Sequence, residues 1–277
     1  MKVKVYGSTG SFPQYSDTFY GGNTTCFVIE SGDFSLIVDA GTGIIKFDKE
    51  LKRKYPNYPA EIGKNMAVIL SHFHIDHIIG LAAFVPAWND SANLNIYAPP
   101  YGDRPLKEQI FGLFHPPYWP INLKDVNVNC LPIAKDQPVN VGPMTIKTMP
   151  ASHADGTVNF HISNGEKSVI YMLDSEMQLL DEAGYEYVVE ICKGADLVVF
   201  DACYAPDDYQ PRRGWGHSTY EEGVKLAQRS GCKRMLFSHF SPEYEAADIN
   251  RWKQDLSKRF PNDGRFIFAH EGMEILI

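Results

Sequence analysis

Three histidines and an aspartate fall within six residues of the chain, at His72, His74, Asp76 and His77. The segment follows an apolar run, residues 67–70, and leads into a helical pattern. His72 and His74, two positions apart, point the same way from an extended segment, and the other two follow at the turn into the helix. Imidazole nitrogens with one carboxylate suit zinc, and also manganese or iron. The motif therefore predicts a metal site at a strand end.

Three further side chains of ligand type also follow apolar runs. They are His153 after residues 145–148, Asp174 after residues 168–173, and His239 after residues 235–237. Each alone is also typical of an ordinary loop residue, but the shared arrangement of apolar strand and then ligand type favours a common site. Asp39 ends another such run, where its carboxylate could hold a ligating imidazole by the second ring N–H or cap the following turn.

A glycine-rich loop, Gly214-Trp215-Gly216-His217-Ser218-Thr219, is a second candidate for chemistry. Its glycines allow a ligand to approach the backbone closely. Thr219 with Glu222 reads as a capping box, and the start of a helix favours a nearby anion. His217 could instead pair with Asp201 for structure alone. Arg212 and Arg213 precede the loop and could clamp a phosphate or serve as surface charge.

Residues 98–120 combine prolines with aromatic side chains around a short helical pattern. Proline is poor in central strands and helix interiors, so the segment predicts a stiff excursion over the surface. It is either a packed connection or a lid over a pocket. As a lid it would offer His115, Tyr118 and Trp119 to a substrate.

The composition narrows the class of partner. The 277 residues carry a formal charge of −8, which disfavours a broad nucleic-acid surface and leaves room for a small anion bound locally. Five cysteines form no C-x-x-C pair, which is typical of reduced thiols. The start of the chain has no apolar leader, and the longest nearly apolar stretch, residues 78–88, is too short for a bilayer. We expect a cytoplasmic protein without membrane contact.

Short β-branched runs dominate the first part of the chain, and strands alternate with helical patterns later. This order predicts an α/β (α+β) fold with two packed sheets and helices on their outer faces, in one domain over residues 1–277. The expected strands span residues 3–6, 26–30, 35–39, 67–70, 94–97, 145–148, 157–162, 168–173, 197–200, 235–237, 266–268 and 274–277. The expected helices span residues 43–53, 76–84, 104–111, 185–193, 219–229 and 245–257.

On these motifs the sequence resembles the metallo-β-lactamase-fold hydrolases, in particular the ribonuclease Z-like phosphodiesterase branch. The H-x-H-x-D-H motif is the strongest element, and His153, Asp174 and His239 follow in the family's order. Residues 216–219 and 238–241 look like two histidine motifs of that branch, and Asp201 stands where ribonuclease Z carries a glutamate. Residues 20–26 and 118–120 look like a bacterial subgroup described as cyclic-nucleotide phosphodiesterases.

The resemblance implies an αββα sandwich with two divalent metal ions, Zn²⁺ or Mn²⁺ first and iron as a further option, in the cleft between two mixed sheets. It assigns His72, His74 and His153 to one ion, Asp76, His77 and His239 to the other, and Asp174 to both. A hydroxide between the ions would be the nucleophile. The catalytic set is then His217, Asp76 and Asp201, with His217 as general acid or electrostatic stabiliser.

Three functions compete. A phosphodiesterase for a small diester such as a cyclic nucleotide would use Arg212, Arg213, Trp215, Ser218 and the aromatic residues of the 98–120 segment as substrate contacts. A tRNA 3′-processing endoribonuclease needs a long arm between the segments of His153 and Asp174, where this chain has room only for two strands and a turn. A non-hydrolytic di-iron oxygen-binding protein commonly carries glutamate at the position of His74. Members of the branch are often dimers, so a homodimer is a further expectation.

Overall fold

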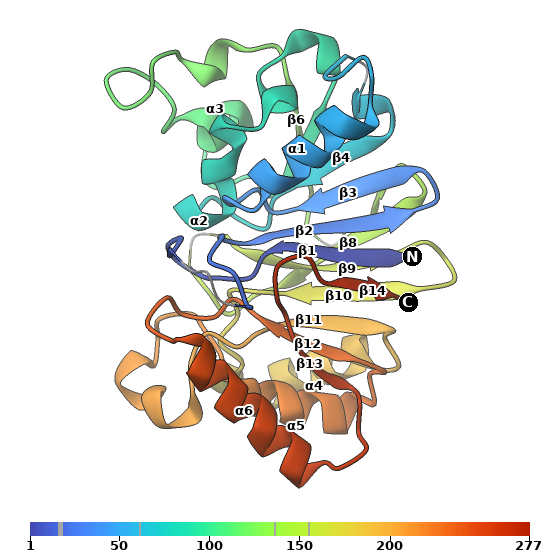
Figure 1. Cartoon of the computed structure of the whole chain (residues 1–277), viewed down its shortest axis with the longest axis vertical. Coiled ribbons are helices and arrows are strands. Elements are labelled where there is room, and N and C mark those ends of the chain that lie inside the picture. The colour runs from blue at the N-terminus through green and yellow to red at the C-terminus, as the bar shows by residue number, and fades with distance from the viewer. Residues whose placement is uncertain (16–18, 61, 136, 155) are drawn as a thin grey trace.

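The computed structural model describes residues 1–15, 19–60, 62–135, 137–154 and 156–277 as two seven-stranded sheets packed face to face (Figure 1). The first sheet has the order β14-β1-β2-β3-β4-β5-β6. Its strands are β14 (Glu274–Leu276), β1 (Lys2–Gly7), β2 (Cys26–Ser31), β3 (Phe34–Val38), β4 (Met66–Ile69), β5 (Asn95–Ala98) and β6 (Asn129–Pro132).

The second sheet has the order β13-β12-β11-β10-β9-β8-β7. Its strands are β13 (Phe266–Phe268), β12 (Met235–Ser238), β11 (Leu197–Asp201), β10 (Ser168–Met172), β9 (Val158–Ser163), β8 (Met144–Pro150) and β7 (Val139–Val141). The first and last strands of the chain, β1 and β14, pair antiparallel, so the two termini lie close together (Figure 1).

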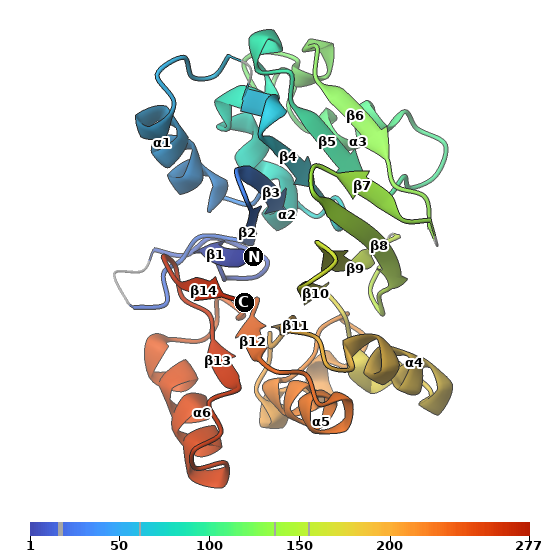
Figure 2. The same ribbon diagram turned by 90° about the vertical axis from the view of Figure 1, so that its right-hand side faces the viewer.

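Helices cover the outer face of each sheet, as the turned view shows (Figure 2). The first sheet carries α1 (Ile44–Lys54), α2 (Ile75–Ile78) and α3 (Leu106–Phe111), and the second carries α4 (Glu182–Cys192), α5 (Tyr220–Ser230) and α6 (Ala246–Arg259). One apolar cluster fills the space between the sheets, and one lies under each group of helices. This is the four-layer αββα order that the sequence predicts.

A block of four parallel strands, which runs from the middle of each sheet to one edge, brings the candidate site together. In the first sheet β3, β4, β5 and β6 run parallel, and in the second β10, β11, β12 and β13 do. Their carboxyl ends therefore meet at one edge of the sandwich. Asp39, Asp174 and His239 each follow such a strand with a positive φ, of 59°, 55° and 65°. Non-glycine residues in this left-handed region are uncommon and cluster at functional sites.

The elements expected from the sequence are all present, with end points shifted by a few residues. Two strands, β6 and β7, were not predicted. β6 has only four residues, all exposed or partly buried, and its sequence contains no β-branched run. The expected helix over residues 76–84 is shorter than predicted, because α2 gives way to a 3₁₀ turn at Ile79–Ala82.

The 98–120 segment forms α3 and the turns around it, at the upper left of Figure 1. Phe111 and Phe114 are buried in the cluster beneath α1, α2 and α3. Part of the segment is thus a packed connection, one of the two alternatives that the sequence left open. Its use as a lid stays a prediction.

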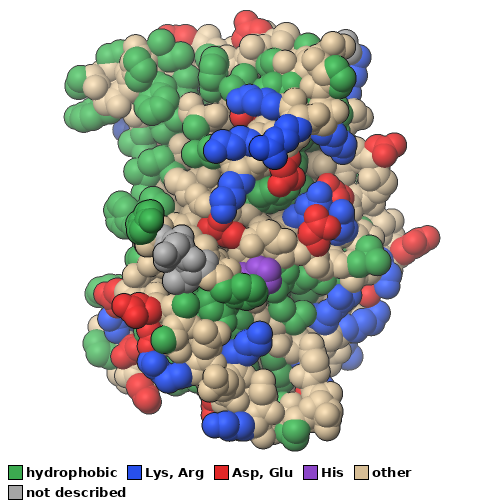
Figure 3. All heavy atoms as spheres, viewed as in Figure 1, with side chains coloured by type: hydrophobic (Ala, Val, Ile, Leu, Met, Phe, Trp, Pro, Cys, Tyr) green, Lys and Arg blue, Asp and Glu red, His purple; other side chains and the backbone are tan. Residues whose placement is uncertain are grey.

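The surface carries both signs of charge. On the face in Figure 3, Lys and Arg side chains lie among Asp and Glu side chains. Within the described ranges, no helix has the length and apolar character needed to cross a membrane.

Candidate metal centre

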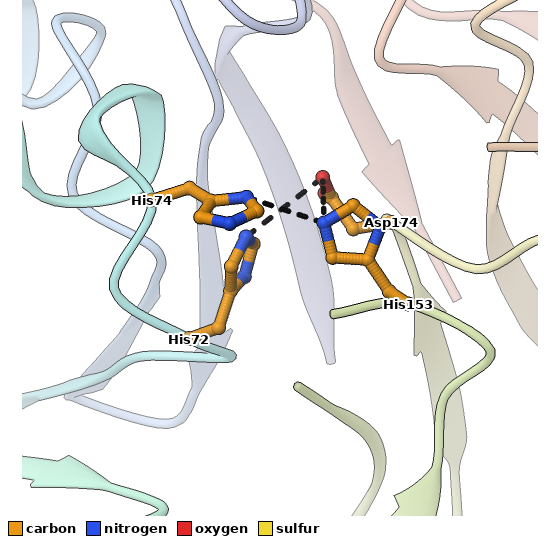
Figure 4. Close-up of side chains that lie close together, drawn as sticks. All are labelled: His72, His74, His153 and Asp174. Atoms are coloured by element: carbon orange, nitrogen blue, oxygen red, sulfur yellow. Dashed lines mark hydrogen bonds and ion pairs between the residues drawn. The ribbon is translucent and has the colours of Figure 1, made fainter. Parts of the chain in front are cut away.

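Four side chains from three loops converge at the carboxyl ends of the strands (Figure 4). His72 and His74 lie in the loop after β4, His153 follows β8, and Asp174 follows β10. Asp174 Oδ1 lies 3.9 Å from His72 Nε2 and 3.7 Å from His153 Nε2. His153 Nε2 lies 3.2 Å from His74 Nδ1. One ligand atom from each of the four falls within 4.8 Å of the others, as a single ion requires.

A second group shares Asp174 through its other oxygen. Asp174 Oδ2 lies 3.0 Å from His77 Nε2 and 3.2 Å from His239 Nε2. Asp76 Oδ2 lies 3.3 Å from each of the same two nitrogens. The structure thus brings all seven predicted ligands together, in the two sets that the resemblance implies, with one carboxylate oxygen of Asp174 facing each set.

Burial tests whether a metal fits this donor set. His72 Nε2 is a buried polar atom without a hydrogen-bond partner, and groups of this kind are rarely left so in proteins. A divalent ion would give this nitrogen a partner. Burial, and then the nearby His77, hold the pKa of His72 well below its usual range, so its nitrogen is free to ligate. The residues present therefore fit a pair of divalent ions with imidazole and carboxylate ligands.

The charges of the centre also favour cations. Burial alone would lower the pKa of His77, but Asp174, Asp76 and Asp39 raise it well above its usual range. Burial alone would raise the pKa of Asp174, but His239 and His77 hold it well below. The carboxylates that attract a proton to His77 would equally attract a metal ion in its place.

Asp39 holds one ligand in position from behind. Its Oδ2 lies 2.8 Å from His77 Nδ1 and accepts a 2.7 Å bond from the Tyr171 hydroxyl. It also accepts bonds from the backbone N–H and the hydroxyl of Ser71, at 2.8 Å and 2.9 Å. Of the two roles that the sequence left open for Asp39, the structure therefore favours support of the predicted ligand His77. The contact directs His77 Nε2 toward the centre.

A histidine–aspartate pair stands beside the two ligand groups. His217 Nδ1 lies 2.9 Å from Asp201 Oδ2, and the His217 ring stacks on that of His239 with centroids 5.1 Å apart. Burial opposes protonation, but Asp201, with smaller effects from Asp174 and Asp76, raises the pKa of His217 to about 9. The pairing that the sequence offered as a purely structural alternative is present, and it lies against the candidate centre.

The loop before α5 departs from the prediction. Thr219 makes no side-chain cap, so the expected capping box with Glu222 is wrong. The Thr219 hydroxyl instead lies 3.4 Å from the amide of Gln178. The Ser218 hydroxyl donates to the Ser175 carbonyl at 2.6 Å and accepts from a backbone N–H. Ser218 is fully buried, so the structure places it in the support of the loop and not at a surface that meets substrate.

The two predicted arginines differ in their surroundings. Arg212 lies 2.5 Å from Glu243, donates to the Asp208 carbonyl and lies over the Tyr204 ring. These contacts hold the Arg212 guanidinium on the surface of the loop, and they therefore disfavour its predicted role in binding a phosphate. Arg213 is exposed. Trp215, two positions before His217 in the sequence, is 62% exposed.

The aromatic residues of the 98–120 segment lie partly in solvent. Tyr118 is 80% exposed, and His115 Nδ1 lies 2.6 Å from a carbonyl of its own turn. Trp119 packs edge-on against a buried phenylalanine. The segment approaches the candidate centre through Tyr101, whose ring lies 3.1 Å from the point where a Cβ on Gly156 would stand, three residues after His153.

One residue of the site has no sequence signal. Glu176, two positions after Asp174, is fully buried and accepts bonds from the backbone of Gly214 and Gly216. Sequence reasoning missed it because a lone glutamate after a strand is indistinguishable from a surface residue. Only the packing of the 209–216 loop over it reveals the contact.

The comparison with protein families agrees with this geometry. Residues 35–240 match the beta-lactamase superfamily domain. The match spans most of the chain and includes all seven candidate ligands, so the protein belongs to this superfamily of metallo-β-lactamase-fold proteins and is a hydrolase of that family.

Individual relatives narrow the comparison. The chain is 28% identical over 242 residues to the probable metallo-hydrolase YhfI of Bacillus subtilis, covering 86% of each chain, and the YhfI crystal structure superposes with a TM-score of 0.72. It is 21% identical to the ribonuclease Z of Haloarcula marismortui over 99% of this chain and 96% of that one. A diphosphatase of the PhnP family shares the fold, with 16% identity, a TM-score of 0.69, and coverage of 100% and 97%.

Proposed function

We propose that this protein is a phosphodiesterase that hydrolyses a small phosphodiester, such as a cyclic nucleotide, at a centre of two divalent ions. The observation that carries the proposal is the sharing of Asp174 between two ligand groups, with one oxygen toward each. Two ions in such a site supply a hydroxide at neutral pH and offset the charge of the phosphoryl oxygens. Manganese and zinc suit the imidazole and carboxylate ligands best, and iron is compatible with them.

The chain's own residues would orient the ester and supply a proton. With Nδ1 bonded to Asp201, Nε2 is the nitrogen of His217 that can donate to the leaving oxygen. Before transfer, the same protonated ring would stabilise charge on the ester. Asp201 would contribute through His217, which it orients, and Asp76 as a ligand of the second ion.

The size of the substrate is argued from the chain around the centre. Between His153 and Asp174 the described residues form β9, β10 and their turns, without a further helix or strand. The long arm of tRNA-processing enzymes is therefore lacking in this part of the structure, and the charge of −8 disfavours a long polyanion. The similarity to ribonuclease Z supports phosphodiester chemistry, and tRNA processing remains the second candidate. His74, a ligand in place of glutamate, disfavours the di-iron oxygen-binding alternative.

Hydrolysis of bis(p-nitrophenyl) phosphate tests the proposal. The purified protein reconstituted with Mn²⁺ or Zn²⁺ should release p-nitrophenolate, and His74→Ala should abolish that activity. His161→Ala is the matched control, since His161 lies in the middle of β9 outside the centre and should retain wild-type turnover. Wild-type protein that is inert with every divalent metal tested would refute the proposal.

A further inference from the structure

A fully buried carboxylate pins the loop beside the candidate centre. Glu176 accepts a 2.6 Å bond from the Tyr209 hydroxyl, bonds of 2.9 Å and 3.1 Å from the Gly214 N–H, and one of 2.8 Å from the Gly216 N–H. Its partners in the described part of the chain include no Lys or Arg side chain. The carboxylate is thus satisfied almost entirely by the loop, and moving the loop would leave its charge buried without donors.

The pinned loop lies directly against one predicted metal ligand. The Gly216 carbonyl lies 3.0 Å from His153 Nδ1, and a Cβ at Gly216 would stand 1.9 Å from that nitrogen. Gly214 and Gly216 both have φ of +88°, a conformation that side-chain-bearing residues rarely adopt. Only glycine therefore lets the backbone point both N–H groups at Glu176 while passing this close to the histidine.

The residue between the two glycines is Trp215, with 62% of its surface exposed. Its neighbours on both sides donate backbone hydrogen bonds to Glu176, so the backbone from which the indole projects is fixed. The indole thus projects from a loop whose next residue, Gly216, lies against the predicted ligand His153, where a flat group of a bound ester could stack on it. Ile75, which lies in the sequence between the predicted ligands His74 and Asp76, is also 41% exposed. It is a second exposed apolar side chain next to candidate ligands.

We propose that Glu176 is a positioning residue that holds Trp215 at the rim of the centre, as a platform for a flat apolar group retained on the substrate phosphate. The inference rests on the proposed phosphodiesterase function and specifies its substrate class. The preferred diester carries, besides the leaving alcohol, an aryl ring or a nucleobase that stacks on the indole. The metal centre and His217 would contact the phosphate, and Trp215 would bind the flat group that stays attached to it.

Two substrates with the same leaving group separate these roles. In bis(p-nitrophenyl) phosphate and methyl p-nitrophenyl phosphate, water attacks phosphorus and the same P–O bond breaks to release p-nitrophenolate. Only the retained group differs, an aryl ring in one and a methyl group in the other. The measured quantity is the ratio of kcat/KM for the aryl to the methyl diester, relative to wild type.

Trp215→Ala should lower this ratio about tenfold, the effect of one lost aromatic stack, and Trp215→Phe should restore most of it. Glu176→Gln should lower it too, because the amide offers one acceptor oxygen where the loop presents two N–H donors. Tyr187→Ala is the control, since Tyr187 is a half-exposed aromatic on α4, and its ratio should equal that of wild type.

Each outcome is decisive. A ratio unchanged in Trp215→Ala, with both diesters hydrolysed, overturns the platform and leaves the phosphodiesterase proposal standing. A wild type inert toward both diesters overturns both. If Glu176→Gln does not fold, Tyr209→Phe removes a single donor to the carboxylate and should lower the ratio by about twofold. A normal ratio in a folded Glu176→Gln protein overturns the positioning role.

Discussion

Replacing Asp39 with asparagine should weaken metal binding, although Asp39 is not itself a proposed metal ligand. The Asp39 carboxylate faces four donors, namely the Nδ1 of His77, the Tyr171 hydroxyl, and the N–H and hydroxyl of Ser71. It has no exposed surface. Asparagine keeps one acceptor oxygen, but its NH₂ group would face donors at the other position. We expect His77 to lose its fixed orientation and the centre to lose one buried negative charge.

The size of the effect follows from the contacts. Losing the carboxylate that orients a metal-bound histidine typically costs 10–100-fold in metal affinity, or about 1.4–2.7 kcal/mol. Leaving one or two of the buried donors unpaired should lower the free energy of unfolding of the metal-free protein by about 2–4 kcal/mol. The two losses are separable, since one depends on metal concentration and the other does not.

Isothermal titration with Zn²⁺ gives the affinities, and urea unfolding in chelator gives the stability. Tyr171→Phe is the matched control, because it removes a hydrogen bond to the same carboxylate but keeps the charge and the contact with His77. It should cost about 1 kcal/mol of stability and leave Zn²⁺ affinity within a factor of two to three. If Asp39→Asn binds two zinc ions with wild-type affinity, the support assigned to Asp39 is refuted.

Three other substitutions test the structure, two in the loop beside the candidate centre and one at Asp196, which directly precedes β11 and lies away from the centre. Gly216→Ala would place a Cβ 1.9 Å from His153 Nδ1, whereas a Cβ at Gly214, which has the same φ of +88°, meets nothing within 4 Å. We therefore expect kcat/KM for bis(p-nitrophenyl) phosphate to fall at least a hundredfold in Gly216→Ala and far less in Gly214→Ala; equal losses would contradict the steric argument. At Asp196 burial opposes ionisation, but a hydrogen bond from Lys233 and further donors lower the pKa to about 2. Since the folded-state pKa is depressed, the stabilisation is present above about pH 4 and is lost as the pH falls toward 2. Asp196→Asn should cost about 1 kcal/mol in urea unfolding at pH 7, after allowance for the exposed lysine, and the difference from wild type should shrink as the pH falls through about 2 and vanish below it; a difference as large at pH 2 as at pH 7 would contradict the linkage.

Most of the fold could be predicted from the sequence, because the patterns that mark strands and helices are local. Residues 197–200 are apolar with two valines and residues 235–237 are apolar throughout, and these runs form the buried parallel strands β11 and β12. The short strand β7 was missed because its three residues alternate in burial, which is too weak a pattern over that length. The strand order was not predicted, because it depends on pairing between distant parts of the chain. The common site was inferred from the repeated arrangement of an apolar run and then a residue of ligand type.

The candidate ligands were visible in the sequence, since histidine and aspartate after an apolar run form an unusual pattern. The residues that support them were not visible. Glu176 acts through backbone N–H groups that lie 38 and 40 positions away, and no residue type marks such a partner. The predicted cap at Thr219 is wrong for the same reason, because the Thr219 hydroxyl lies near the amide of Gln178, which is distant in the sequence. Local rules cannot anticipate a partner that only tertiary packing supplies.

The central claim is a centre of two divalent ions that share Asp174. Anomalous diffraction at the metal edge, on crystals of the zinc-reconstituted protein, tests it most directly. The account predicts two peaks per chain, one bounded by His72, His74 and His153 and one by Asp76, His77 and His239, with one Asp174 oxygen on each. A single peak, or a bound ion pair from which Asp174 is turned away, would contradict it.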